Sequence, residues 1–128
     1  MRTKGKILGG WAVGLCLCLA LDAPAELKVL GKGDQRRFDA SSFPPDMKGR
    51  YDLFVVKCNS ANSKCHALGR AVEAISTGVA PNSKTPFDRE AAKQYGVKMM
   101  RKPDSGIDKK EAKELVQLMY FLLDQARN

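Results

Sequence analysis

The sequence is poor in histidine and tryptophan. It contains one histidine, His66, and one tryptophan, Trp11. Hydrolase chemistry by a side-chain nucleophile needs a partner base, and a single histidine leaves little choice for one. We find no strand-like alternation of apolar and polar residues and no internal repeat. These absences favour a helical protein without a hydrolase site.

Residues 1–25 have the pattern of an export signal. Three basic side chains among the first six residues precede an apolar segment, residues 7–20, which is too short to span a bilayer. Small residues at 23–25 then stand at cleavage spacing. We therefore expect cleavage after Ala25, with no stable membrane span afterwards. A retained N-terminal anchor helix is the alternative.

Cleavage would leave two of the four cysteines, Cys58 and Cys65, and a positive charge. Residues 1–25 contain three basic and one acidic side chain, so residues 26–128 keep 19 basic and 13 acidic ones, a net charge of +6. The basic residues are scattered among acids, and there is no arginine-rich tract, so we expect no nucleic-acid partner. The charge favours steering toward an acidic protein partner, with ordinary solubility as the alternative. The length indicates one small domain, which we expect to be monomeric.

The first half of the exported chain predicts a lead-in and two helices. Residues 26–45 are rich in glycine, serine and proline and predict an extended lead-in. Residues 46–58 place apolar side chains at three- and four-residue spacing, which predicts a helix that ends at Cys58. A short helix is expected over residues 67–75, before Gly78.

The second half predicts two more helices. Thr85 before Pro86 is typical of an N-cap followed by proline at the first helical position, so we expect a helix from there to about Met99. Asp108 and Glu111 form a capping-box pattern that begins the last helix. The fold class is therefore all-α, with three to five helices. Two methionines, Met47 and Met119, stand at helical spacing among aliphatic residues and are expected to fill the core.

The arrangement of Cys58, Cys65 and His66 carries the chemistry. Covalent haem attachment needs a thiol that adds across a vinyl group, and an imidazole next to that thiol reaches the iron from the same side. A sixth ligand is then expected from a methionine, and Met99 and Met100 lie in the right region, at the end of a predicted helix.

The spacing of the two cysteines departs from the usual pattern. Six residues separate them instead of two. Four extra residues are close to one helical turn, of about 3.6 residues, and could bulge out while both cysteines bind haem. Attachment through Cys65 alone is a second interpretation, and a Cys58–Cys65 disulfide is a third. Zinc fits poorly, because two cysteines and one histidine leave a fourth ligand to be found.

Four segments resemble the class I cytochrome c family, and more narrowly the small single-haem periplasmic cytochromes of metal-reducing and anaerobic bacteria. They are residues 38–45, 51–58, 65–70 and 97–107, within a match over about residues 38–125. The resemblance implies a cytochrome c-like helical domain, residues 46–128, wrapped around one haem c. It also implies a periplasmic location.

The resemblance also implies roles for individual residues. Cys58 and Cys65 would form thioether bonds, and His66 would be the proximal ligand. When positions are matched to the family's pattern backward from Pro103 and Ile107, the distal ligand falls on Met99. When they are matched forward from Val97, it falls on Met100. We prefer Met99.

Three further expectations follow from the same resemblance. Arg70 would pair with a haem propionate, although a solvated arginine is an equal alternative. Tyr95 would stand in for a tryptophan that the family carries in its distal-side helix. The first and last helices would cross, with Phe54 or Tyr51 near Tyr120 or Phe121.

With both axial positions filled by protein, the iron has no vacancy for a substrate, so we expect a one-electron carrier and not an enzyme. Its partners would be other redox proteins with acidic docking surfaces. Two alternatives remain open: a disulfide-linked, exported helical binding module without haem, and a haem-based ligand sensor.

Overall fold

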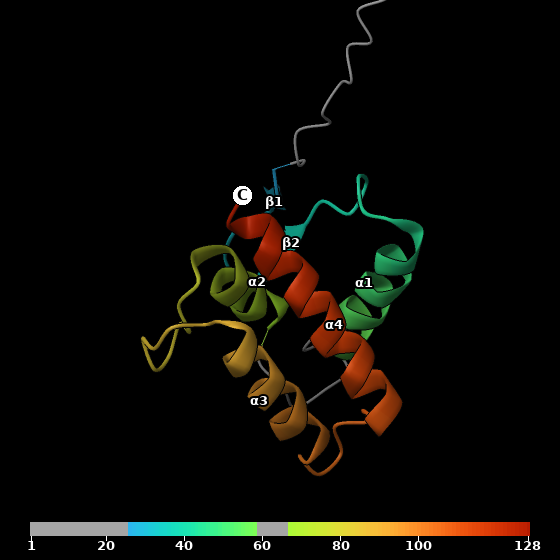
Figure 1. Cartoon of the computed structure of the whole chain (residues 1–128). Coiled ribbons are helices and arrows are strands. Elements are labelled where there is room, and N and C mark those ends of the chain that lie inside the picture. Colours follow the sequence, from blue (N-terminus) through green and yellow to red (C-terminus); the bar gives the residue numbers. More distant parts are fainter. Residues whose placement is uncertain (1–25, 59–66) are drawn as a thin grey trace, which may run out of the picture.

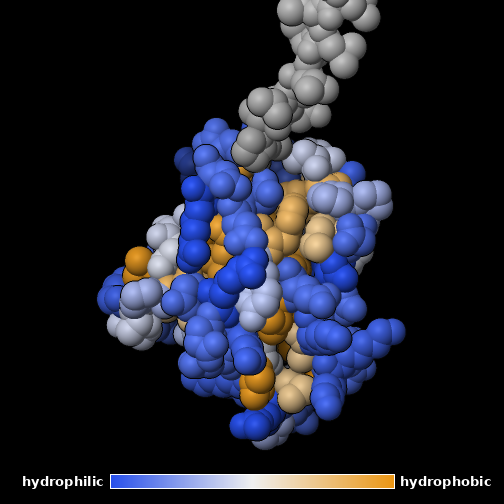
Figure 2. Space-filling model, viewed as in Figure 1, coloured by the Kyte–Doolittle hydropathy of each residue, from blue (hydrophilic) through white to orange (hydrophobic). Residues whose placement is uncertain are grey.

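The computed structural model describes residues 26–58 and 67–128, and these residues are mostly helical. Helix α4 crosses the molecule with α1 on one side and with α2 and α3 on the other (Figure 1), and it contacts all three. The expectation of a mainly helical fold is confirmed. In the same view, hydrophilic residues cover most of the visible face, and hydrophobic residues show between them (Figure 2). The helices are α1 (Pro45–Cys58), α2 (Leu68–Thr77), α3 (Arg89–Met100) and α4 (Lys109–Ala126).

The lead-in forms a small hairpin. Strands β1 (Val29–Leu30) and β2 (Arg37–Phe38) pair antiparallel, and a single 3₁₀ turn, η1 (Gly33–Gln35), joins them. Strands of two residues are too short to show the alternation that identifies a strand in a sequence. The segment also supplies the core with Phe38, which is 2% exposed, and with Phe43. Sequence reasoning missed this contribution to the core.

Tyr51 ties the hairpin to α1. Its hydroxyl accepts a hydrogen bond from the backbone N–H of Phe38 (2.7 Å) and donates one to the carbonyl of the same residue (3.0 Å). Burial raises the pKa of the Tyr51 phenol. The ring of Phe43 packs edge-on against the rings of Tyr51 and Phe121, with ring centroids 5.7 Å and 5.2 Å apart, respectively. Helices α1 and α4 therefore meet in this region partly through a residue of the lead-in.

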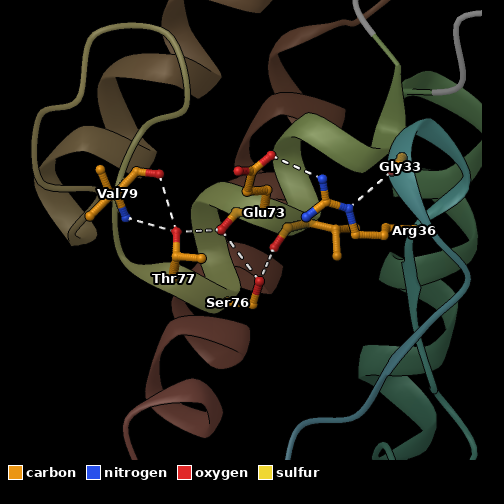
Figure 3. A network of polar contacts seen from close by, with 7 residues as sticks. Gly33, Arg36, Glu73, Ser76, Thr77 and Val79 are labelled. Atoms are coloured by element: carbon orange, nitrogen blue, oxygen red, sulfur yellow. Dashed lines mark hydrogen bonds and ion pairs between the residues drawn. The ribbon is translucent and has the colours of Figure 1, made fainter.

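A polar network holds η1 against α2, as Figure 3 shows. Arg36 donates to the carbonyl of Gly33 at 3.0 Å and to the carboxylate of Glu73 at 3.1 Å. The packing beneath this network is tight, because a side chain at Gly69 would overlap the carbonyl oxygen of Gly33 and lie 2.9 Å from the Cα of Asp34. The first turn of α2 is thereby fixed against the lead-in.

The start of α3 differs from the prediction. Residue Thr85 is not an N-cap: its carbonyl accepts the N–H of Ala80 at 2.9 Å, and Pro86 forms an isolated antiparallel bridge with Val79. The helix begins at Arg89, where the side chain of Asp88 accepts the N–H of Ala91. Pairing with Val79 and Ala80, in the segment just after α2, thus overrides a local cap pattern.

The remaining helix bounds agree with the sequence to within about two residues. Helix α1 begins one residue early and ends at Cys58. Helix α2 continues to Thr77 and stops at Gly78, which has a left-handed φ of 70°. The capping box at Asp108 and Glu111 is present, with both reciprocal hydrogen bonds made.

Candidate functional site

An apolar pocket lies among the four helices. Its walls come from α1, α2, α3 and α4 and from the turn after α2, and they include Phe54, Ile75, Leu115 and Met119. The cavity itself has a volume of about 80 Å³, and the space reaches about 790 Å³ only when the open solvent at its mouth is included. Apolar side chains with a few polar groups among them are typical of cofactor and small-molecule sites.

Three residues that the sequence singled out line this pocket. Cys58 is the last residue of α1 and is 8% exposed. Arg70 lies in the first turn of α2 and is exposed, and among the described residues it is the one charged side chain in the pocket lining. Met99 comes from the last turn of α3. The fold therefore brings together side chains from positions far apart in the sequence.

The two candidate methionines are not equivalent. Both are half-buried, but only Met99 lines the pocket. Tyr95, four residues earlier on α3, lines it as well, because residues four apart share one face of a helix. Its ring packs against Phe87 with centroids 5.4 Å apart. The pocket side of α3 is thus defined by Tyr95 and Met99.

A further sulfur on the pocket wall was missed by sequence reasoning. Met119 of α4 is buried, as expected for a core residue, and it also lines the pocket. The sequence predicts that Met119 belongs to the apolar face of α4. It does not predict the pocket, because the pocket depends on how α4 packs against α1 and α3.

Gly96 sets how closely α3 approaches α4. A Cβ at this position would overlap Cγ2 of Val116 and would lie 3.7 Å from the carbonyl oxygen of Ala112. A glycine therefore permits a close helix crossing beside the pocket, which Gly96 also lines. No sequence pattern singled out this residue, because a glycine inside a helix has many explanations.

Cys65 and His66 lie outside the described residues. The described residues on both sides of the gap do reach the pocket, with Cys58 on one side and Arg70 and Ala71 on the other. Among residues 26–58 and 67–128, no three histidine, cysteine, aspartate or glutamate side chains form a group that could hold a metal ion. In the same part of the chain, no helix has the length and apolar character needed to cross a membrane.

Comparisons of the chain with protein-family models, with curated proteins and with solved structures found no match.

Proposed function

We propose that this chain is an exported, single-haem c-type cytochrome that carries one electron at a time between redox proteins. The observation that supports the proposal best is the convergence of Cys58, Arg70 and Met99 on one apolar pocket. These residues were selected from the sequence for three different roles toward one cofactor, and they come from three different helices.

The lining of the pocket suits haem in its chemistry. Haem, when bound, supplies an iron that changes oxidation state by one electron. The apolar wall, with residues such as Phe54, Ile75 and Leu115, would exclude water from a porphyrin face. A thioether at Met99 offers a soft, neutral ligand, and the exposed guanidinium of Arg70 offers a partner for a carboxylate at the edge.

Covalent attachment of haem and proximal ligation of its iron are assigned to a segment that connects two pocket-lining elements, α1 and α2. Cys65 would form a thioether bond and His66 would bind the iron, while Cys58 would form the second thioether bond. The proposal is supported by Cys58 and by the first turn of α2, which both line the pocket on either side of this segment. Attachment by one bond would leave the role of His66 unchanged.

Electron transfer, and not catalysis, follows from the proposed ligand set. An iron bound by both a histidine and a methionine has no vacant position for a substrate. The export pattern of residues 1–25 supports a periplasmic location for this activity. We also propose that the protein is a monomer.

Replacement of methionines tests the proposed site. The variants are Met99→Leu and, as a matched control one residue away, Met100→Leu, produced in cells that attach haem c. We expect Met99→Leu to remove the sulfur-to-iron charge-transfer band at the red end of the oxidised spectrum. Met100→Leu should keep the band, because Met100 does not line the pocket.

Other outcomes would change the assignment in defined ways. Loss of the band only in Met100→Leu, or only in Met119→Leu, would show that Met99 is not the ligand. Binding of carbon monoxide to the reduced wild-type protein would contradict a six-coordinate electron carrier and favour a ligand sensor. A His66→Ala variant that keeps a low-spin spectrum would contradict the proposed proximal ligand.

A further inference from the structure

The outer face of α3 carries a set of basic side chains around an exposed valine. Lys93, Lys98 and Arg101 line a shallow hollow together with Val97. Val97 is 37% exposed and lies one helical turn from both Lys93 and Arg101. We call Lys93, Val97, Lys98 and Arg101 the α3 basic face. Of the described residues that line the hollow, Glu90 is the one acid.

Basic residues of α4 extend this face. Helices α3 and α4 pack together where Gly96 meets Val116. Lys109 and Lys113 are exposed and, from helical periodicity, stand beside the stripe of α4 that contacts α3. Lys102, just beyond the end of α3, is exposed as well. Exposed basic side chains therefore lie on both helices beside the turn from α3 into α4 (Figure 1), and the turn itself also carries the exposed acids Asp104 and Asp108.

None of the cations of the α3 basic face forms an ion pair with any described residue. Elsewhere several basic side chains are paired, as Arg36 is with Glu73 and Arg89 with Asp124. Lys98 instead lies over the ring of Tyr95, with its Nζ 5.9 Å from the ring centroid. The charges of the face are thus available to a partner.

We propose that the α3 basic face binds the acidic surface of a partner protein. Its chemistry fits such a partner better than a nucleic acid, because one arginine and several lysines provide little of the bidentate phosphate recognition that guanidinium groups give. The four residues of the α3 basic face include no aromatic side chain for base stacking or for insertion into a membrane. Val97 gives the centre an apolar contact inside a charged rim, an arrangement common in protein interfaces.

The face lies on the opposite side of the same helix as the pocket. Tyr95 and Met99 line the pocket, whereas Val97 and Lys98 point to the outer hollow. One helix, about 10 Å thick, therefore separates a docked partner from the pocket. Electron transfer across α3 to the docked partner rests on the proposed function. The binding of an acidic protein to the α3 basic face does not depend on the proposed function.

Charge reversal on the face tests the proposal. The full-length protein would be titrated with poly-L-glutamate as an acidic polypeptide probe, and binding would be mapped by backbone amide NMR shifts. We expect shifts in residues 93–102 and 109–113 that vanish at high salt. Lys93→Glu/Lys98→Glu should weaken binding about tenfold. The matched control is Lys32→Glu/Lys48→Glu, which reverses two exposed charges outside the face and should weaken binding less than twofold.

Several results would overturn the proposal. Equal weakening by the two double variants would show that only net charge matters. Tighter binding to phosphatidylglycerol vesicles or to a single-stranded oligonucleotide than to poly-L-glutamate would assign the face to a membrane or to nucleic acid. A colourless protein that still binds the probe through this face would refute the proposed function alone, and a haem protein that does not bind it there would refute this inference alone.

Discussion

Replacement of Gly69 by alanine should destabilise the protein, although it removes a glycine from a helix. Gly69 is the second residue of α2, and an added Cβ would overlap the carbonyl oxygen of Gly33 and approach the Cα and carbonyl carbon of Asp34 to 2.9 and 3.0 Å. All three obstacles are backbone atoms, so relief requires η1 to move away from α2. The same movement would strain the contact between Arg36 and Glu73, which lies beside them (Figure 3).

The expected change in the free energy of unfolding is the difference between two opposed effects. Alanine gains at most about 1 kcal/mol over glycine in a helix. Overpacking of this kind costs about 1–3 kcal/mol, and backbone obstacles favour the upper part of that range. We expect a net loss of about 1–2 kcal/mol in the free energy of unfolding, or roughly 5–15 °C in Tm for a domain of this size.

Gly49→Ala provides the matched control. Gly49 lies inside α1, and nothing stands within 4 Å of a Cβ added there. This variant should gain about 0.5–1 kcal/mol. Urea denaturation followed by far-ultraviolet circular dichroism measures both changes. A Gly69→Ala protein as stable as the wild type or more stable would refute the tight packing of α2 on η1.

Two further predictions concern the core and a helix end. Tyr51→Phe should cost about 1–3 kcal/mol, because the backbone N–H and carbonyl of Phe38 lose their buried partner. Burial raises the pKa of the Tyr51 phenol above its unfolded value near 10, so its contribution is complete below about pH 10 and declines as pH rises above that value. Urea denaturation from pH 8 to pH 11 should therefore show a steeper alkaline loss in the wild type than in Tyr51→Phe. Asp108→Ala should cost about 1 kcal/mol, since it removes the side chain that accepts the N–H of Glu111; a change in Tm smaller than that of an exposed control such as Lys110→Ala would contradict the role of the cap.

The sequence predicted features that depend on neighbouring residues and missed those that depend on distant ones. The capping box at Asp108 and the end of α1 at Cys58 are local, and both were found. Thr85 and Pro86 have the pattern of a helix start, but they pair with the segment just after α2, and the helix begins at Arg89. No local pattern could place Phe38 in the core.

The candidate site divides in the same way. Residue chemistry selected Cys58 and the pair Met99 and Met100, and the family resemblance added Arg70; Cys58, Arg70 and Met99 all line the pocket. It was insufficient to place Met119 on the pocket wall or to find the close helix approach at Gly96, because both depend on how α4 packs against other helices. From the sequence, the choice of Met99 over Met100 rests on the family's pattern alone. The position of Met99 in the pocket lining supports the same choice independently.

Intact mass under denaturing conditions, measured on protein produced with haem-attachment machinery, tests the central proposal most directly. We expect the mass of the chain from residue 26 plus one covalently bound haem, with a sharp low-spin absorption spectrum in the reduced form. The band position of the pyridine haemochrome would then distinguish one thioether bond from two. A colourless protein two hydrogens lighter than the reduced chain would indicate a disulfide between Cys58 and Cys65, and it would contradict the assignment as a cytochrome.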